Sequence, residues 1–233
     1  MRATTWEFRN RATVFGIIFG AAFVLYTLDH VNAAAGLADW IADACGWDAN
    51  VVVRAVLLCA AGFMGACAMV RMWASGYLRA DVVYAADVKT AALVADGPYR
   101  HVRNPLYFGN VLMAIGIGAT ASRAGFFVLI VAMVLFCYRL IFREEAELLA
   151  AQGESYAAYL RAVPRLWPAI RARVSSAAAP ANWTAGFRAE AWSWSLFAGL
   201  VVFAITLDLR AMFVATAAGI GLAWVWSRGG GGK

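Results

Sequence analysis

Apolar residues run along this chain in six long segments that are separated by shorter polar stretches. The segments cover residues 12–28, 51–73, 106–120, 124–142, 191–207 and 211–226. A helix that crosses a bilayer needs about 20 apolar residues, with about 17 as a lower limit. The second and fourth segments reach this length alone, and the others reach it when flanking aromatic and neutral residues are counted. The pattern predicts an all-α, polytopic membrane helix bundle with about six transmembrane helices.

The polar stretches indicate how these helices connect. Ser122-Arg123 leaves room only for a tight turn, so the third and fourth segments are expected to form a helical hairpin. Gly153 is expected to end the helix after the fourth segment, and Pro164 and Pro168 end the next one. Residues 29–50 are expected to form an external loop with a short amphipathic helix.

Composition supports a membrane protein, because 63% of the residues are hydrophobic and only 15% are charged. A soluble domain of this size would expose more charge. The first segment is longer than the apolar region of a typical signal peptide and lacks a small-residue cleavage site. We therefore expect it to remain as a helix.

Charge gives the expected orientation. Lys and Arg residues cluster before the first segment, between the second and third, between the fourth and fifth, and after the sixth. Since cytoplasmic loops carry an excess of these residues, both termini are predicted to be cytoplasmic. The net charge of +6 then favours anionic headgroups rather than nucleic acid, and no basic stripe with interleaved aromatic residues indicates a nucleic-acid partner.

The metal-binding residue types are sparse. The four cysteines lie mainly in apolar segments without a CxxC pair, so we expect buried free thiols. His30 and His101 are the only histidines. The sequence therefore predicts no metal centre.

A polar, turn-rich stretch, residues 96–109, lies at the start of the third segment. Asn104-Pro105 is expected to supply the N-cap and first residue of a helix, which places backbone N–H groups beside Arg103. Such a helix start suits an anion. Tyr99 and Tyr107 offer aromatic faces for an adenine ring or a cation.

A second polar cluster, residues 143–148, follows the fourth segment and is expected on the same membrane face. There, Glu144 or Glu145 would accept hydrogen bonds from an ammonium group or from ribose hydroxyls. An anion site, stacking rings and a carboxylate together suit a zwitterionic nucleoside such as S-adenosylmethionine.

The ordered motifs in these clusters resemble the isoprenylcysteine carboxyl methyltransferase family, which belongs to a wider group with the phospholipid methyltransferases. The motifs are Gly97-Pro98-Tyr99, Arg103-Asn104-Pro105-x-Tyr107-x-Gly109, Glu144-Glu145-x-x-Leu148, Gly153, Tyr156, Tyr159 and Pro164-Arg165-x-x-Pro168. The resemblance covers about residues 51–170. It implies a membrane-embedded, S-adenosylmethionine-dependent methyltransferase whose lipophilic acceptor arrives from the bilayer.

The resemblance also implies a set of cofactor-binding residues. It carries this role to Tyr99, Arg103, Pro105, Tyr107, Glu144 and Glu145, and Gly97, His101 and Asn104 of the first polar cluster are further cofactor-binding candidates. Asn104 stands where the family more commonly has histidine. A contact assigned to that imidazole would then be made by the asparagine amide or be lost.

The catalytic candidates are Arg165, Arg161 and Glu154. An acceptor carboxylate or phosphate would be positioned by Arg165 or, second, by Arg161, whereas an acceptor amine would need a carboxylate such as Glu154. A prenylated protein, a phospholipid amine and a small lipophilic acid all remain open as acceptors. Frequent Ala, Gly and Arg favour a bacterial source, and hence an inner-membrane enzyme with a cytoplasmic site.

This interpretation divides the chain into four parts. They are a first transmembrane helix and external loop (1–50), the methyltransferase core (51–170), a linker (171–190), and an additional transmembrane hairpin with a flexible tail (191–233). Two alternatives remain: an NADPH-dependent membrane reductase of the sterol or enone type, and a non-enzymatic scaffold or transporter. The oligomeric state is left open.

Overall fold

The computed structural model describes residues 2–78 and 95–229, which form helices and connecting loops with one isolated bridge, between Asn32 and Ser122. The helices are α1 (Thr5–Arg9), α2 (Arg11–Val24) with its 3-10 continuation η1 (Leu25–Thr27), α3 (Ala33–Cys45), α4 (Ala49–Tyr77), η2 (Gly97–Arg100), α6 (Pro105–Gly118), α7 (Arg123–Gln152), α8 (Glu154–Ala162), α9 (Trp183–Thr206) and α10 (Leu209–Gly229). The prediction of an all-α fold is confirmed for these residues.

Each of the six apolar segments contains a helix, but the helices differ in length. Within the described residues, α4, α7, α9 and α10 are long and apolar enough to cross a membrane. The helix from Arg11 to Thr27 and α6 are apolar but shorter. The structure thus supports four candidate spans of the six that the sequence predicts.

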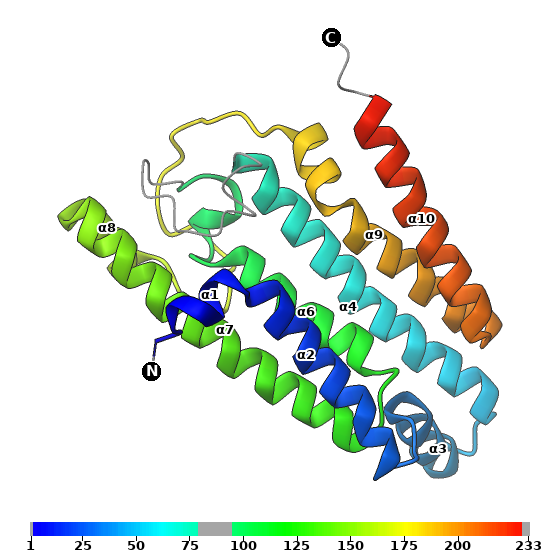
Figure 1. Ribbon diagram of the computed structural model, residues 1–233. Coiled ribbons are helices and arrows are strands. Elements are labelled where there is room, and N and C mark those ends of the chain that lie inside the picture. Colours follow the sequence, from blue (N-terminus) through cyan, green and yellow to red (C-terminus); the bar gives the residue numbers. More distant parts are fainter. Residues whose placement is uncertain (1, 79–94, 230–233) are drawn as a thin grey trace.

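The long helices lie side by side in one bundle (Figure 1). Helix α7 contacts α2 and α6, α6 contacts α4, α9 packs along α4, and α10 packs against α9. The N-terminal helix α1, helix α8 and the C-terminal end of α10 lie at one end of the bundle, whereas α3 lies at the other. The described N-terminal and C-terminal ends of the chain therefore lie at the same end of the bundle. The structure contains no membrane, so the cytoplasmic location of the termini stays a prediction.

Small residues allow close helix contacts at the centre of this bundle. A Cβ atom on Gly116 of α6 would lie 2.8 Å from the Ala60 carbonyl oxygen of α4. On the other side of α6, Val111 joins Leu129, Met133 and Leu140 of α7 in the largest buried cluster. Close packing of this kind is a main source of helix association in lipid, where apolar burial alone gives little.

The connections largely follow the sequence-based expectations. The Ser122 hydroxyl caps α7 by accepting from the Gly125 N–H at 3.0 Å, which closes the α6–α7 hairpin. Gly153, with φ +57°, ends α7 and directly precedes α8. The linker is shorter than predicted: Asn182 caps α9, so residues 183–190 are helical and the hairpin begins earlier than residue 191. Of the predicted Gly-rich tail, residues 229–233, Gly229 ends α10 and residues 230–233 lie outside the described residues.

Candidate functional site

The segment before α6 is fixed in place by helix α8. The Tyr159 hydroxyl donates a 2.8 Å hydrogen bond to the Tyr99 carbonyl oxygen, and both side chains are buried. Burial raises the pKa of the Tyr159 hydroxyl, so the group stays protonated and remains a donor. Tyr99 therefore belongs to a rigid turn in which its ring is packed inside protein.

Asp96, one residue before η2, holds a distant loop. Its carboxylate accepts from the Ser176 hydroxyl at 2.6 Å and from the backbone N–H groups of Ala177 and Ala179 at 3.1 Å. The Ser176 hydroxyl first, and then these N–H groups, lower the pKa of Asp96 below its ordinary value. The start of the linker is thus tied to the edge of the candidate site.

His101 lies in the same interface between loops. Its Nδ1 atom is 2.9 Å from the Ala169 carbonyl oxygen, and the Ala169 N–H donates to the His101 carbonyl oxygen at 2.9 Å. Arg100 continues the pairing, because its Nε–H donates to the Val174 carbonyl oxygen. These contacts hold His101 within the turn and against the loop at Ala169. Its role in binding a cofactor stays a prediction.

Arg103 caps the C-terminal end of α8. Its guanidinium donates to the carbonyl oxygens of Leu160 and Val163, the latter at 2.7 Å, and its side chain is only 7% exposed. Cations favour the C-terminal end of a helix, where carbonyl groups lack partners within the helix. The Nε–H of Arg103 donates to Glu145 at 2.9 Å. This arginine therefore joins the two polar clusters that the sequence placed on one face.

Glu145 is the centre of that junction. Arg103 bonds its Oε1 atom, and Arg165 donates to its Oε2 atom from both Nε and NH2 at 2.9 Å. The Glu145 side chain is 7% exposed, whereas that of Arg165 is 37% exposed and lies over the Phe142 ring. Two guanidinium groups thus neutralise one buried carboxylate, and the excess positive charge faces outward at Arg165.

Asn104 and Pro105 occupy the predicted N-cap and first position of α6, but the Asn104 side chain does not cap the helix. Its amide nitrogen instead donates to the Arg165 carbonyl oxygen at 2.9 Å and lies 3.4 Å from Glu145. The asparagine therefore positions the segment that carries Arg165.

Tyr107 and Glu144 form a second unit beside this junction. The buried Tyr107 hydroxyl donates to Glu144 Oε1 at 2.6 Å. Within the described residues, Glu144 takes part in no ion pair with an arginine or lysine, in contrast to Glu145. Its carboxyl group is held by a neutral donor, the Tyr107 hydroxyl.

Two of the three catalytic candidates lie elsewhere. Arg161 and Glu154 pair with each other at 2.5 Å on the surface of α8, with side chains 66% and 82% exposed. Arg165, in contrast, lies within the junction.

Gly97, a cofactor-binding candidate, lies in η2 with φ +55°, a backbone conformation that favours glycine.

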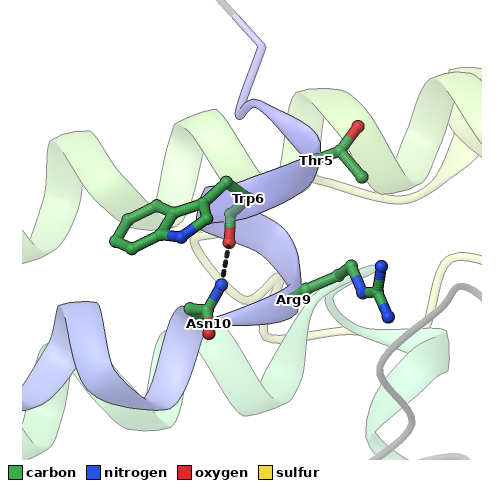
Figure 2. Close-up of a pocket in the computed structure, with 4 residues that line it drawn as sticks. All are labelled: Thr5, Trp6, Arg9 and Asn10. Atoms are coloured by element: carbon green, nitrogen blue, oxygen red, sulfur yellow. Dashed lines mark hydrogen bonds between the residues drawn. The ribbon is translucent and has the colours of Figure 1, made fainter.

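Sequence reasoning missed the N-terminal helix α1. Glu7 binds Arg139 of α7 through both carboxylate oxygens, at 2.7 and 2.8 Å, and Phe8 packs in the same buried cluster as Tyr107. A hollow of about 570 Å³ opens beside α1, lined by Thr5, Trp6, Arg9 and Asn10 (Figure 2). The signal was present in the sequence, because Thr4 and Glu7 have the spacing of a capping box.

A buried ion pair between Arg71 of α4 and Glu190 of α9 was also missed. The two residues are far apart in sequence, and each lies near the end of an apolar segment, where a solvated charge is the usual expectation. Within residues 2–78 and 95–229, no group of three or more His, Cys, Asp or Glu side chains is placed to hold a metal ion.

Comparisons with known proteins match the same region. A family model described as phospholipid methyltransferase matches residues 52–153. The chain is 31% identical over 169 residues to the cobalt-zinc-cadmium resistance protein CzcN of Cupriavidus metallidurans, which covers 70% of this chain and 72% of that protein. It is 25% identical over 126 residues to the nickel-cobalt-cadmium resistance protein NccN of Alcaligenes xylosoxydans xylosoxydans, covering 53% of this chain and 55% of that protein. No solved structure matches significantly.

Proposed function

Because this chain belongs to the phospholipid methyltransferase family, we propose that it is an integral membrane enzyme that transfers a methyl group from S-adenosylmethionine to a lipophilic acceptor. The family implies a methyltransferase, and the four long apolar helices agree with a membrane location. The observation that carries the proposal is the junction of α6, α7 and residues 163–168, where the Tyr107–Glu144 unit lies beside Glu145 and its two arginines.

The donor set at this junction fits the proposed cofactor. S-adenosylmethionine, when bound, supplies a methyl group on a sulfonium cation and presents an ammonium group and two ribose hydroxyls. Glu144 suits a cationic or hydroxyl partner because Tyr107, a neutral donor, holds its carboxylate. Glu145 is a weaker candidate, because Arg103 and Arg165 already bind both of its oxygens. The structure thus favours Glu144 where the sequence left the two glutamates equivalent.

Arg165 is the best placed of the catalytic candidates to orient an acceptor. Its guanidinium is held by Glu145 on one side and by the Phe142 ring on the other, yet 37% of the side chain is exposed. A fixed, partly exposed guanidinium suits a carboxylate or phosphate of the acceptor. Such fixed positioning is a large part of catalysis for a reaction that needs little proton transfer.

We propose the cytoplasmic face of a bacterial inner membrane as the location of this site, on the charge pattern of the loops. The two relatives are named for resistance to cobalt, zinc, cadmium and nickel, and we propose that the methyl transfer contributes to resistance of this kind. Growth of a metal-sensitive host expressing the wild type or Glu144→Gln, on media containing these metals, tests that setting.

The test of the proposed function combines binding with turnover. Calorimetry of the purified protein should detect S-adenosylmethionine, and incubation with radiolabelled cofactor and a total lipid extract should label a lipid that mass spectrometry can identify. Glu144→Gln should abolish both, whereas Glu147→Gln, three residues further along α7 and 39% exposed, serves as the matched control.

The proposal would be refuted if the wild-type protein neither binds S-adenosylmethionine nor labels a lipid. A thermal shift with NADPH, and none with S-adenosylmethionine, would instead support the reductase alternative. Flux of a solute through liposomes that contain the protein would support a transporter.

A further inference from the structure

A buried polar network joins three helices beside the candidate site. Arg71 of α4 binds Glu190 of α9 through Nε at 2.7 Å and NH2 at 3.0 Å, and the Ser75 hydroxyl donates to the same carboxylate at 3.0 Å. The side chains of Arg71 and Glu190 are 9% and 0% exposed. The Trp192 ring covers the guanidinium, with its centroid 5.1 Å from Arg71 Cζ.

The remaining nitrogen of this guanidinium reaches α6. Arg71 NH1 donates to the Asn110 side-chain oxygen at 2.7 Å and to the Leu106 carbonyl oxygen at 3.3 Å. Leu106 lies between Pro105, the first residue of α6, and Tyr107, which holds Glu144. The network therefore reaches the helical turn that carries candidate cofactor-binding residues.

Gly109 allows this contact, because a Cβ atom there would lie 2.5 Å from Arg71 Cγ. The stem of Arg71 thus rests directly on the α6 backbone. A shift of Arg71 would be transmitted to α6 by contact as well as by hydrogen bonding.

Helix α9 holds Glu190 in register with Arg71. A Cβ atom on Gly186, one turn before Glu190, would lie 2.5 Å from the Met72 carbonyl oxygen, so the two helices touch closely there. The Asn182 N–H, one further turn back, donates to the Gly76 carbonyl oxygen at 2.8 Å. These contacts leave α9 little freedom to slide along α4.

Charges inside a membrane protein are costly and usually serve a function, and an apolar pair would often pack as stably as a buried ion pair. We infer that Glu190 is a positioning residue for the proposed methyl transfer, acting through Arg71 to fix the first turns of α6 and hence Tyr107. The inference rests on the proposed function. It gives a role to the C-terminal hairpin, which lies outside the region that matches the family, residues 52–153.

The test compares single and double variants in detergent. Glu190→Gln removes the carboxylate that binds the buried Arg71 guanidinium, and we expect the unfolding temperature to fall by on the order of 10 °C. In the double variant Arg71→Met/Glu190→Leu neither charge remains, so stability should recover. In Glu190→Gln and in the double variant α6 should nevertheless be misplaced, which should lower kcat by about ten- to a hundredfold relative to the wild type. Asp29→Asn, which loses a carboxylate near the α3 end of the bundle, is the matched control.

Hydrogen–deuterium exchange supplies a measurement that needs no cofactor. Amides of residues 106–110 should exchange faster in Glu190→Gln and in the double variant than in the wild type and in Asp29→Asn. Recovery of both stability and turnover in the double variant would overturn the inference, because the pair would then be structural only. Unchanged α6 exchange in the double variant would overturn it as well.

The two hypotheses fail in different ways. If the wild type neither binds S-adenosylmethionine nor transfers methyl, the proposed function fails, and the exchange of α6 still decides whether Glu190 positions that helix. If the wild type is active and the double variant is equally active, the inference fails and the proposed function stands.

Discussion

The Tyr107 hydroxyl and the Glu144 carboxylate meet at 2.6 Å across the α6–α7 hairpin. Residue 107 lies in the first turn of α6, and residue 144 lies in the last third of α7. The contact therefore joins the two polar clusters at a point where no arginine of the described residues pairs with the carboxylate. Its neighbour Glu145 is bound by two arginines.

Tyr107→Phe should weaken S-adenosylmethionine binding by about ten- to a hundredfold. A hydrogen bond to a charged group contributes about 1.5–3 kcal/mol, and without it the Glu144 carboxylate is no longer held in one orientation. Calorimetry measures the change, with Tyr138→Phe on α7 as the control. Equal affinity of the two variants would show that the phenol does not support the binding site.

Glu145→Gln should destabilise the protein by about 3–5 kcal/mol, because it leaves the buried Arg103 guanidinium without its carboxylate. The half-exposed Arg165 should contribute little to this loss, since water can solvate it. Chemical unfolding in detergent measures the effect. A loss below about 1 kcal/mol would mean that the carbonyl oxygens of Leu160 and Val163 satisfy Arg103 without Glu145.

Arg161→Gln and Glu154→Gln should each change the free energy of unfolding by less than about 1 kcal/mol, because their ion pair is exposed to solvent. Methyl transfer by these variants, measured beside that of Arg165→Gln, separates the three catalytic candidates. A fall in kcat at unchanged stability for either α8 variant would show that α8 touches the acceptor.

Gly97→Ala should be far more destabilising than Gly153→Ala. Both glycines have positive φ, +55° and +57°, which costs a residue with a side chain on the order of 1–3 kcal/mol. A Cβ atom on Gly97 would in addition overlap the Tyr77 ring, whereas one on Gly153 would meet nothing within 4 Å. Thermal unfolding compares the two, and similar losses would mean that the Tyr77 ring moves aside.

Asp96 should make stability depend on pH in the acid range. Its pKa in the folded protein is lower than the ordinary value of 3.8, so its contribution is present above about pH 4 and is lost as the pH falls through the lowered pKa. Asp96→Asn should therefore be less stable than the wild type near neutral pH, and the difference should shrink below about pH 4. Unfolding curves at several pH values measure it; an equal difference at pH 3 and pH 6 would exclude the carboxylate charge as its source.

Local signals in the sequence were sufficient for much of this fold. The apolar segments, the tight turn at Ser122-Arg123, the Gly153 break and the Asn104-Pro105 helix start each depend on residues close together in the chain. The meeting of residues 96–109 with residues 143–148 also followed, because two helices joined by a tight turn must bring their far ends together.

The details of the site did not follow from the sequence, because they depend on contacts between distant residues. No local pattern shows that Arg103 binds the end of α8, or that Asn104 bonds the Arg165 carbonyl oxygen instead of capping α6. Glu144 and Glu145 are adjacent and chemically identical, and only their helical orientation separates a carboxylate held by tyrosine from one held by two arginines.

The distance in sequence between Arg71 and Glu190 has a consequence for biosynthesis. The two residues are 119 positions apart. At a synthesis rate of about 5–20 residues per second, the ribosome needs roughly 6–24 seconds to make the chain between them. Helix α6 ends at Gly118, so for the last 72 of these positions, roughly 4–14 seconds at the same rate, α4 and α6 are both present without the carboxylate of α9. The first turn of α6 would thus gain the support of Glu190 only when α9 joins the bundle, so the candidate site becomes fully ordered after the whole region that matches the family, residues 52–153, has been made.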